Sequence, residues 1–234
     1  MAITEVASQR ASSGTNGGAD SDALAFPNNV TSGNLLVVGG ATWVSGGITS
    51  ISVTDSLTPS TTYTVVLGTA FGFLTGIRTF LAYGVAPSSG ACTVTVNPSG
   101  SSVDFSFGID EFTGEADPPS DVNGGDTQGS STAPSDGITT GVDNALILGL
   151  MTHSDIIATM APEGAQTQIS EEESNVNNQC HNFSFKIVGA AGAQTMSGTL
   201  SVSDDWGEQT HSFKPAGGAS VVPVLMRQYR QRKS

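Results

Sequence analysis

Val103-Asp-Phe-Ser-Phe-Gly-Ile109 decides the fold, because its apolar and polar residues alternate with a period of two. Successive side chains of a β-strand point to opposite faces of a sheet, so the four apolar side chains are expected to share one face. Similar short runs recur along the chain, and Gly, Ser, Asn and Pro turn signals separate them. The sequence therefore predicts an all-β protein.

The composition supports the same fold class. Only 12% of the 234 residues are charged and 29 are Gly, whereas Lys and Glu, which commonly coat helices, are scarce. Regular short strands predict an antiparallel, jelly-roll-like β-sandwich. The expected strands are residues 2–7, 24–26, 35–44, 48–53, 61–67, 78–85, 92–96, 103–109, 145–151, 156–160, 167–170, 182–188, 195–202 and 209–213. Residues 12–22 and 114–137 are expected to be loops.

Three pairs of similar segments occur in the same order in the two halves and predict an internal duplication. They are Gly33-Asn-Leu-Leu-Val-Val-Gly39 with Asp143-Asn-Ala-Leu-Ile-Leu-Gly149, Phe80-Leu-Ala-Tyr-Gly-Val85 with Phe183-Ser-Phe-Lys-Ile-Val188, and Ser89-Gly-Ala-Cys-Thr-Val94 with Ala191-Gly-Ala-Gln-Thr-Met196. We expect one sandwich domain over residues 1–216, with half-repeats at about 24–114 and 137–215. Strands of both halves would share its core, because a half of this size buries too little surface to be stable alone. Residues 217–234 would form a C-terminal arm.

Further motifs follow the same order along the chain. They are Ile51-Ser-Val-Thr-Asp-Ser56, Thr61-Thr-Tyr-Thr64, Leu81-Ala-Tyr83, Thr93-Val-Thr-Val96, Glu111-Phe-Thr-Gly114, Trp206 and Phe213-Lys-Pro215. Together with the Gly33 and Asn144 segments, they resemble a duplicated jelly-roll or lectin-like β-sandwich module of phage virion proteins and bacterial surface proteins. Leu57-Thr-Pro-Ser60 departs from the module, which has a Gly-Asn hairpin turn there. The resemblance implies no enzymatic activity and no cofactor.

Catalytic and metal-binding signals are weak. The sequence has no Gly-x-Ser-x-Gly elbow, and His153, His181 and His211 are predicted to lie at the surface or at strand edges. Glu111 is predicted to make a structural hydrogen bond. We therefore predict no catalytic residue, no metal ligand and no cofactor. Four groups of acidic residues are predicted to be solvated loop charge, with a Ca²⁺ site as the alternative: Asp20 with Asp22; Asp117 with Asp121 and Asp126; Glu171 to Glu173; and Asp204 with Asp205.

Cysteine and aromatic residues leave alternatives open. Cys92 and Cys180 are predicted to be buried thiols, and a disulfide between them is the alternative. Trp43 and Trp206 are predicted to pack in the core. A glycan platform that uses some of the Trp and Tyr residues is the alternative.

Charge is distributed unevenly between the body of the chain and its C-terminal arm. The net charge is −13, which disfavours nucleic-acid binding, yet half of the eight basic residues lie in the last eight positions. We see no signal peptide and no apolar run long enough to span a membrane. The arm is predicted either to dock on a partner or to be a disordered, solubilising end. The candidate docking residues are Val221, Val222, Val224, Leu225, Met226, Arg227, Tyr229, Arg230, Arg232 and Lys233.

These features favour a non-enzymatic phage virion protein, made in the host cytoplasm and then incorporated into the particle. A capsid decoration (cement) protein, or a head- or tail-associated protein, would stabilise the particle through subunit contacts. Its partners would be the major capsid protein or other virion proteins, and it would form a homo-oligomer such as a trimer. The alternative is a glycan-binding adhesin or receptor-binding module.

Overall fold

The computed structural model describes residues 2–13, 16–43, 48–68, 76–99, 103–153, 158–173 and 180–217. These residues form eighteen strands, all paired antiparallel, and no helix. The all-β prediction is therefore confirmed. Within the described ranges no helix has the length and apolarity that a membrane span requires.

The first half of the chain forms two sheets, named here the large and small N-terminal sheets. In the large sheet the order is β1-β10-β5-β8-β7, with β2 and β3 also paired to β10, and in the small sheet it is β4-β9-β6. The large-sheet strands are β1 (Thr4–Glu5), β2 (Ala11–Ser12), β3 (Asn16–Ala19), β5 (Leu35–Trp43), β7 (Thr64–Leu67), β8 (Ile77–Val85) and β10 (Val103–Thr113). The small-sheet strands are β4 (Asp22–Ala25), β6 (Ile51–Asp55) and β9 (Thr93–Pro98).

The second half repeats this arrangement in the large and small C-terminal sheets. Their orders are β11-β18-β13-β16-β15 and β12-β17-β14. The large-sheet strands are β11 (Glu115–Ser131), β13 (Leu146–His153), β15 (Thr167–Glu173), β16 (Cys180–Ile187) and β18 (Asp204–Pro215). The small-sheet strands are β12 (Ser135–Thr140), β14 (Met160–Pro162) and β17 (Gly192–Leu200).

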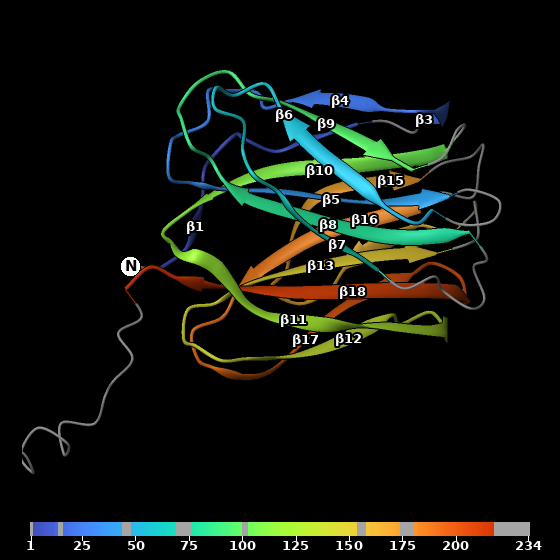
Figure 1. Cartoon of the computed structure of the whole chain (residues 1–234). Helices are drawn as coiled ribbons and strands as arrows, with labels where there is room; N and C mark the ends of the chain where they lie inside the picture. Colours follow the sequence, from blue (N-terminus) through green and yellow to red (C-terminus); the bar gives the residue numbers. More distant parts are fainter. Residues whose placement is uncertain are drawn as a thin grey trace, which may run out of the picture.

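The four sheets stack in layers, with the two large sheets in the middle and one small sheet on each outside (Figure 1). Each half is thus a sandwich of its own, and no sheet mixes strands of the two halves. The core that the halves share is instead the layer between the large sheets. Buried residues of both halves pack there, among them Leu35, Val37, Phe112, Leu148, Phe183 and Phe213.

The duplication is visible in the strand order. From β4 to β10, every strand of the first half has a counterpart eight strands later in the same place in its sheet. Leu35 and Leu146 each begin the second strand of this repeat and pair with Phe112 and Phe213, and all four lie in the shared core. The sequence match placed Leu36 opposite Leu146. In the structure, Leu35 is the residue equivalent to Leu146, which is a displacement of one residue from the sequence match. Such a shift moves a side chain to the other face of its sheet, so only the structural equivalence pairs residues that face the same way.

Two predicted loops are wrong. Residues 12–22 contain β3, which pairs with β10, and residues 114–137 contain β11, which is the longest strand described. β11 is an edge strand with register shifts between Glu115 and Asp126, and it includes Pro118 and Pro119. An edge strand needs partners on one side only, so it tolerates the Pro, Gly and Asp residues that a central strand excludes.

Candidate interaction surfaces

Within the described strands β4, β6 and β9, the outward face of the small N-terminal sheet carries no charged side chain. Its exposed or half-buried residues alternate with inward-facing Val and Ile residues, and they are Ala23, Ala25, Ser52, Thr54, Thr93, Thr95 and Asn97. Thr54, Thr95 and Ala23 lie side by side across the three strands. The result is a surface of small hydroxyl, amide and methyl groups.

The outward face of the small C-terminal sheet has the same character. Its outward residues are Ser135, Gly137, Thr139, Ala161, Ala193, Thr195, Ser197 and Thr199. Thr139 pairs with Ala193, and Ser135 pairs with Ser197. The two ends of the stack therefore present similar uncharged faces, and we call these the outer faces.

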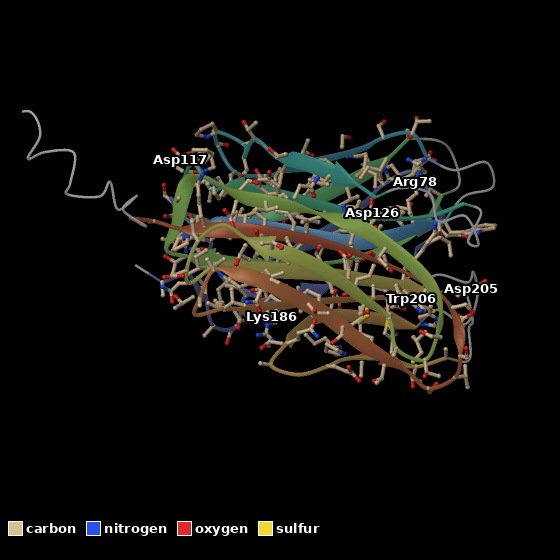
Figure 2. All side chains as sticks on the ribbon, turned by 90° about the horizontal axis from the view of Figure 1, so that it is seen from below. Arg78, Asp117, Asp126, Lys186, Asp205 and Trp206 are labelled. Atoms are coloured by element: carbon tan, nitrogen blue, oxygen red, sulfur yellow. The ribbon has the colours of Figure 1, made fainter. Side chains whose placement is uncertain are left out.

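No acidic residue is among the outward residues named for the two outer faces, although Glu163 borders the C-terminal one, where its amide donates to the Ser197 oxygen at 2.9 Å. Figure 2 shows Asp117 and Asp205 at opposite ends of the large C-terminal sheet along its strand direction, in β11 and β18. The alternation in Ile51-Ser-Val-Thr54 and Thr93-Val-Thr-Val96 is the sequence signal for such a face, because it puts Ser and Thr on the side opposite the buried Val and Ile residues.

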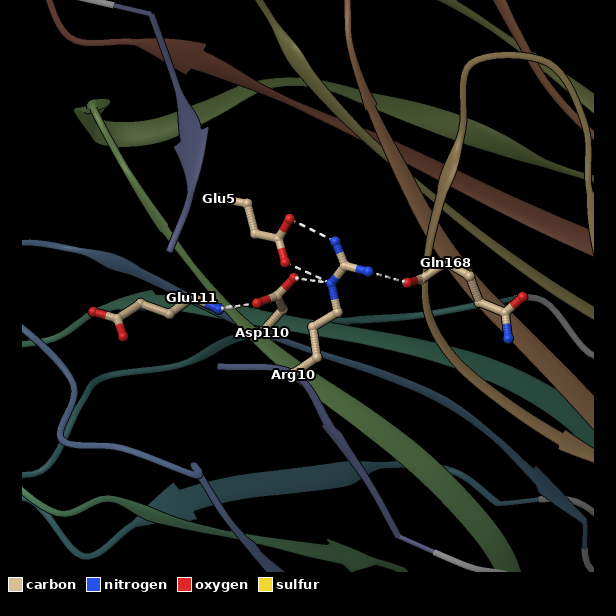
Figure 3. A network of polar contacts seen from close by, with 5 residues as sticks. All are labelled: Glu5, Arg10, Asp110, Glu111 and Gln168. Carbon is tan, nitrogen blue, oxygen red and sulfur yellow. Dashed lines mark hydrogen bonds and ion pairs between the residues drawn. The ribbon is translucent and has the colours of Figure 1, made fainter. Parts of the chain in front are cut away.

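A polar network joins the two halves beside the shared core (Figure 3). Arg10 donates to both carboxylate oxygens of Glu5 at 2.5 Å and to the main-chain oxygen of Gln168 on β15 at 2.7 Å. Its Nε lies 3.5 Å from Oδ2 of the fully buried Asp110. Burial, opposed by the hydrogen bond from the Glu111 amide, raises the pKa of Asp110 to about 7.

The prediction of a structural hydrogen bond at Glu111 is confirmed. This fully buried carboxylate accepts hydrogen bonds from Asn34 Nδ2 at 2.6 Å, Gln9 Nε2 at 2.7 Å and the Thr31 amide at 2.8 Å. Gln9 in turn accepts from the Asn28 amide. Glu111 therefore ties the N-terminal segment and the loop before β5 to β10.

The predicted surface position of the histidines is wrong, because all three are buried. His181 lies between the large sheets, with Ser106 Oγ 2.8 Å from Nδ1 and Ser170 Oγ 3.0 Å from Nε2. Burial lowers its pKa to about 4. A neutral imidazole accepts a hydrogen bond through one ring nitrogen and donates through the other. His181 can therefore hydrogen-bond with Ser106 of the large N-terminal sheet and with Ser170 of the large C-terminal sheet.

The other predicted residues are also placed within the sandwiches. Trp206 is 7% exposed and packs with Met151, Met160 and Leu200, while Trp43 packs on Ile77, as expected for core residues. Cys92 and Cys180 are buried free thiols. The predicted loop positions of three acidic groups are wrong: Asp117 to Asp126, Glu171 to Glu173 and Asp204 with Asp205 lie in β11, β15 and β18. In the fourth group the prediction is right for Asp20 and wrong for Asp22, which begins β4. No group of three or more candidate metal ligands occurs in the described part of the chain.

A groove of about 270 Å³ lies beside β7 and β8, against the start of β11. Its lining includes Thr62, Thr64, Tyr83 and Asp117. Tyr83 is 9% exposed, and its ring packs edge-on against Phe213 at 4.9 Å between centroids. The groove thus combines hydroxyl groups, a carboxylate and a small aromatic surface.

Comparison with protein-family models gave no match, and no curated protein was significantly similar to the chain. The virion and surface-protein module suggested by the motifs therefore remains a prediction. The candidate docking residues between Val221 and Lys233 lie outside the described residues. Gly217, the last described residue, follows Ala216, whose amide donates to the Gly114 oxygen at 2.7 Å, so the arm starts next to the junction of the two halves.

Proposed function

We propose that this chain is a non-enzymatic structural protein of a phage particle, as a capsid decoration protein or a head- or tail-associated protein. The observation that carries the proposal is the four-layer stack with an uncharged outer face at each end. Like-charged copies and acidic neighbours repel, so surfaces without charge are where such a protein can approach other subunits closely. Two opposed outer faces would let one molecule bridge two neighbours.

The C-terminal arm would add a second kind of contact. Residues 221–226 are apolar apart from Pro223, and residues 227–233 include four basic side chains. Such a segment suits an acidic partner surface, since the apolar part supplies buried area and the bases supply complementary charge. The partner would be a major capsid protein or another virion protein, with copies of this chain assembled as a homo-oligomer.

The test is to purify particles on a density gradient from the host that produces this chain, and to identify the chain by mass spectrometry. The proposal predicts that the full chain bands with the particles in a fixed ratio to the capsid protein. A chain shortened to residues 1–217, which keeps every described strand, is expected to be lost from them. A full chain found only in the soluble fraction would contradict the proposal, and retention of the shortened chain would remove the arm from it.

A glycan-binding role is the second candidate, and the groove beside Tyr83 favours it. Sugar sites combine an aromatic surface with a few polar groups, as this groove does. Asp117→Ala and Thr64→Ala change exposed lining residues. On a glycan array, saturable binding that both substitutions abolish would support this role, and no binding by the folded full chain would exclude it for the glycans tested.

A further inference from the structure

The two sandwiches differ in one row of their interiors. In the first, Phe80, Gly40 and Phe107 lie side by side across β8, β5 and β10. Counted from the equivalent residues Leu35 and Leu146, the same row of the second sandwich is Asn182, Met151 and Glu208. Two fully buried phenylalanines of one half thus correspond to an amide and a carboxyl group in the other.

Glu208 is buried without hydrogen-bond donors. It is 1% exposed, and neither of its oxygens accepts a hydrogen bond from a described residue. A buried carboxylate is expected to be paired or hydrogen-bonded, so this environment suits the neutral acid far better than the anion.

The charged groups around Glu208 do not offset the cost of burying its carboxylate as an anion. From β12, Asp136 uses its two oxygens to accept hydrogen bonds from Thr127 and Thr210 at 2.5 and 2.6 Å, and its charge disfavours a second anion at Glu208. From β16, Lys186 donates to the main-chain oxygen of Thr195. Burial first, and then Asp136, raise the pKa of Glu208 well above its usual value, while Lys186 opposes the shift.

The remaining strands place more titratable side chains on this face of the large C-terminal sheet. Glu171 of β15 continues the row, next to Asn182, and Cys180, His153 and Asp204 lie toward the other end of β16, β13 and β18. β14 and β17 contain no titratable residue, and His153 on β13 lies 3.2 Å from Asp204 of the same large sheet.

The apolar packing of the second sandwich is also divided. One cluster surrounds Ile147 and Met196, and another surrounds Met151 and Trp206, whereas the first sandwich has one continuous cluster. The small C-terminal sheet is therefore held by two separate patches, and Glu208 lies in the same row as Met151 of the second patch.

We propose that Glu208 is a pH-operated latch on the second sandwich: with Glu208 neutral the small C-terminal sheet stays packed, and ionisation of Glu208 separates this sheet from the large one. The first sandwich and the shared core stay closed, because Phe107 occupies the place of Glu208 in the first half. The device goes beyond the proposed structural role, since it would expose the outer sheet of one half only.

Hydrogen exchange of the full chain, followed by mass spectrometry at pH 6 and pH 9 and corrected for intrinsic rates, tests the latch. In the unchanged protein, peptides from residues 135–140 and 192–200 are expected to exchange at least tenfold faster at pH 9. Peptides from residues 51–55 and 93–98, the corresponding sheet of the first half, should not change. Glu208→Gln, which keeps the shape of the side chain and removes its charge, is expected to abolish the acceleration.

Two further variants keep the test decisive. Glu115→Gln removes another carboxyl group whose pKa burial raises, to about 7, and it should leave the acceleration intact. Glu208→Met puts an apolar side chain in the equivalent place to Phe107 and should protect the small sheet as Glu208→Gln does. Equal acceleration in the unchanged protein and in both Glu208 variants would overturn the proposal, as would simultaneous opening of the first sandwich.

Discussion

Arg10 Nη1 donates to the main-chain oxygen of Gln168 at 2.7 Å, so one side chain near the N-terminus holds an edge strand of the second half. The same guanidinium binds Glu5 and lies beside the buried Asp110, with its carbon 5.5 Å from the centre of the Phe185 ring. It contributes charge to the first half and packing to the second. The two sandwiches are thus joined by a polar contact as well as by their shared apolar core.

Arg10→Ala is expected to destabilise the protein by about 3 kcal/mol at pH 8, because it leaves the carboxylate of Asp110 buried without its cation. At pH 5 the loss should be smaller, since the pKa of Asp110 is about 7 and the neutral acid needs no cation. Urea unfolding at both pH values measures this. Adding Asp110→Asn should recover part of the stability, and Lys214→Ala is the control for loss of a cation. An equal loss at both pH values would contradict the role assigned to Asp110.

Glu111→Ala is expected to cost about 3 kcal/mol, because the Asn34 and Gln9 amides and the Thr31 main-chain amide all lose their acceptor. Glu111→Gln should cost less, since one oxygen still accepts. Thermal and urea unfolding give the two values. If Glu111→Ala unfolds like the unchanged protein, the network does not hold the N-terminal segment.

Because His181 is buried, we expect the free energy of unfolding to fall at acidic pH. Its pKa is about 4 in the fold, against about 6.5 in an unfolded chain, so the unfolded state binds the extra proton between these values. The stability contributed by neutral His181 is therefore complete above pH 6.5 and is lost as the pH falls to 4. The destabilisation caused by His181→Gln should shrink by up to about 3 kcal/mol across this window. Phe183→Leu, which removes no proton site, should show a constant destabilisation, and a constant value for His181→Gln would refute the assignment.

Gly39 sets how closely the halves approach. A Cβ atom at this position would lie 2.8 Å from the Phe183 ring of the opposite sheet. Gly39→Ala is therefore expected to cost about 1–3 kcal/mol through overpacking. Phe183→Leu in the same chain should lessen the penalty, whereas Gly125→Ala, with open space at its Cβ, should be neutral. Additive losses from Gly39→Ala and Phe183→Leu would show that the two positions do not contact.

The central strands could be read from the sequence because both of their faces are buried. β5 and β8 carry near-continuous apolar runs, and they start within a residue of the predicted limits. β11 could not be predicted, because an edge strand is fixed by main-chain pairing with β18, and its Pro, Gly and Asp residues indicate a loop.

The duplication could be predicted from the sequence, but the face of each large sheet that packs against the other half could not. Similar residues such as Gly39 and Gly149 point to opposite sides of their sheets, toward Phe183 and Met196 respectively, and local similarity has no information on which face meets the other half. The buried histidines show the same limit. His181 is tolerated inside only because Ser106 and Ser170, distant in sequence, meet its two nitrogens.

The central claim is that the uncharged outer faces make the contacts of a particle protein. Its most direct test is binding to particles, measured by co-sedimentation, of chains with two lysines on one face: Thr54→Lys with Thr95→Lys, or Thr139→Lys with Ala193→Lys. Each pair is adjacent across two strands. Thr31→Lys with Ser32→Lys, at two exposed neutral residues before β5, is the matched control. At least one outer-face variant is expected to lose binding with its unfolding temperature unchanged, while the control binds normally. Undiminished binding by both outer-face variants would contradict the claim.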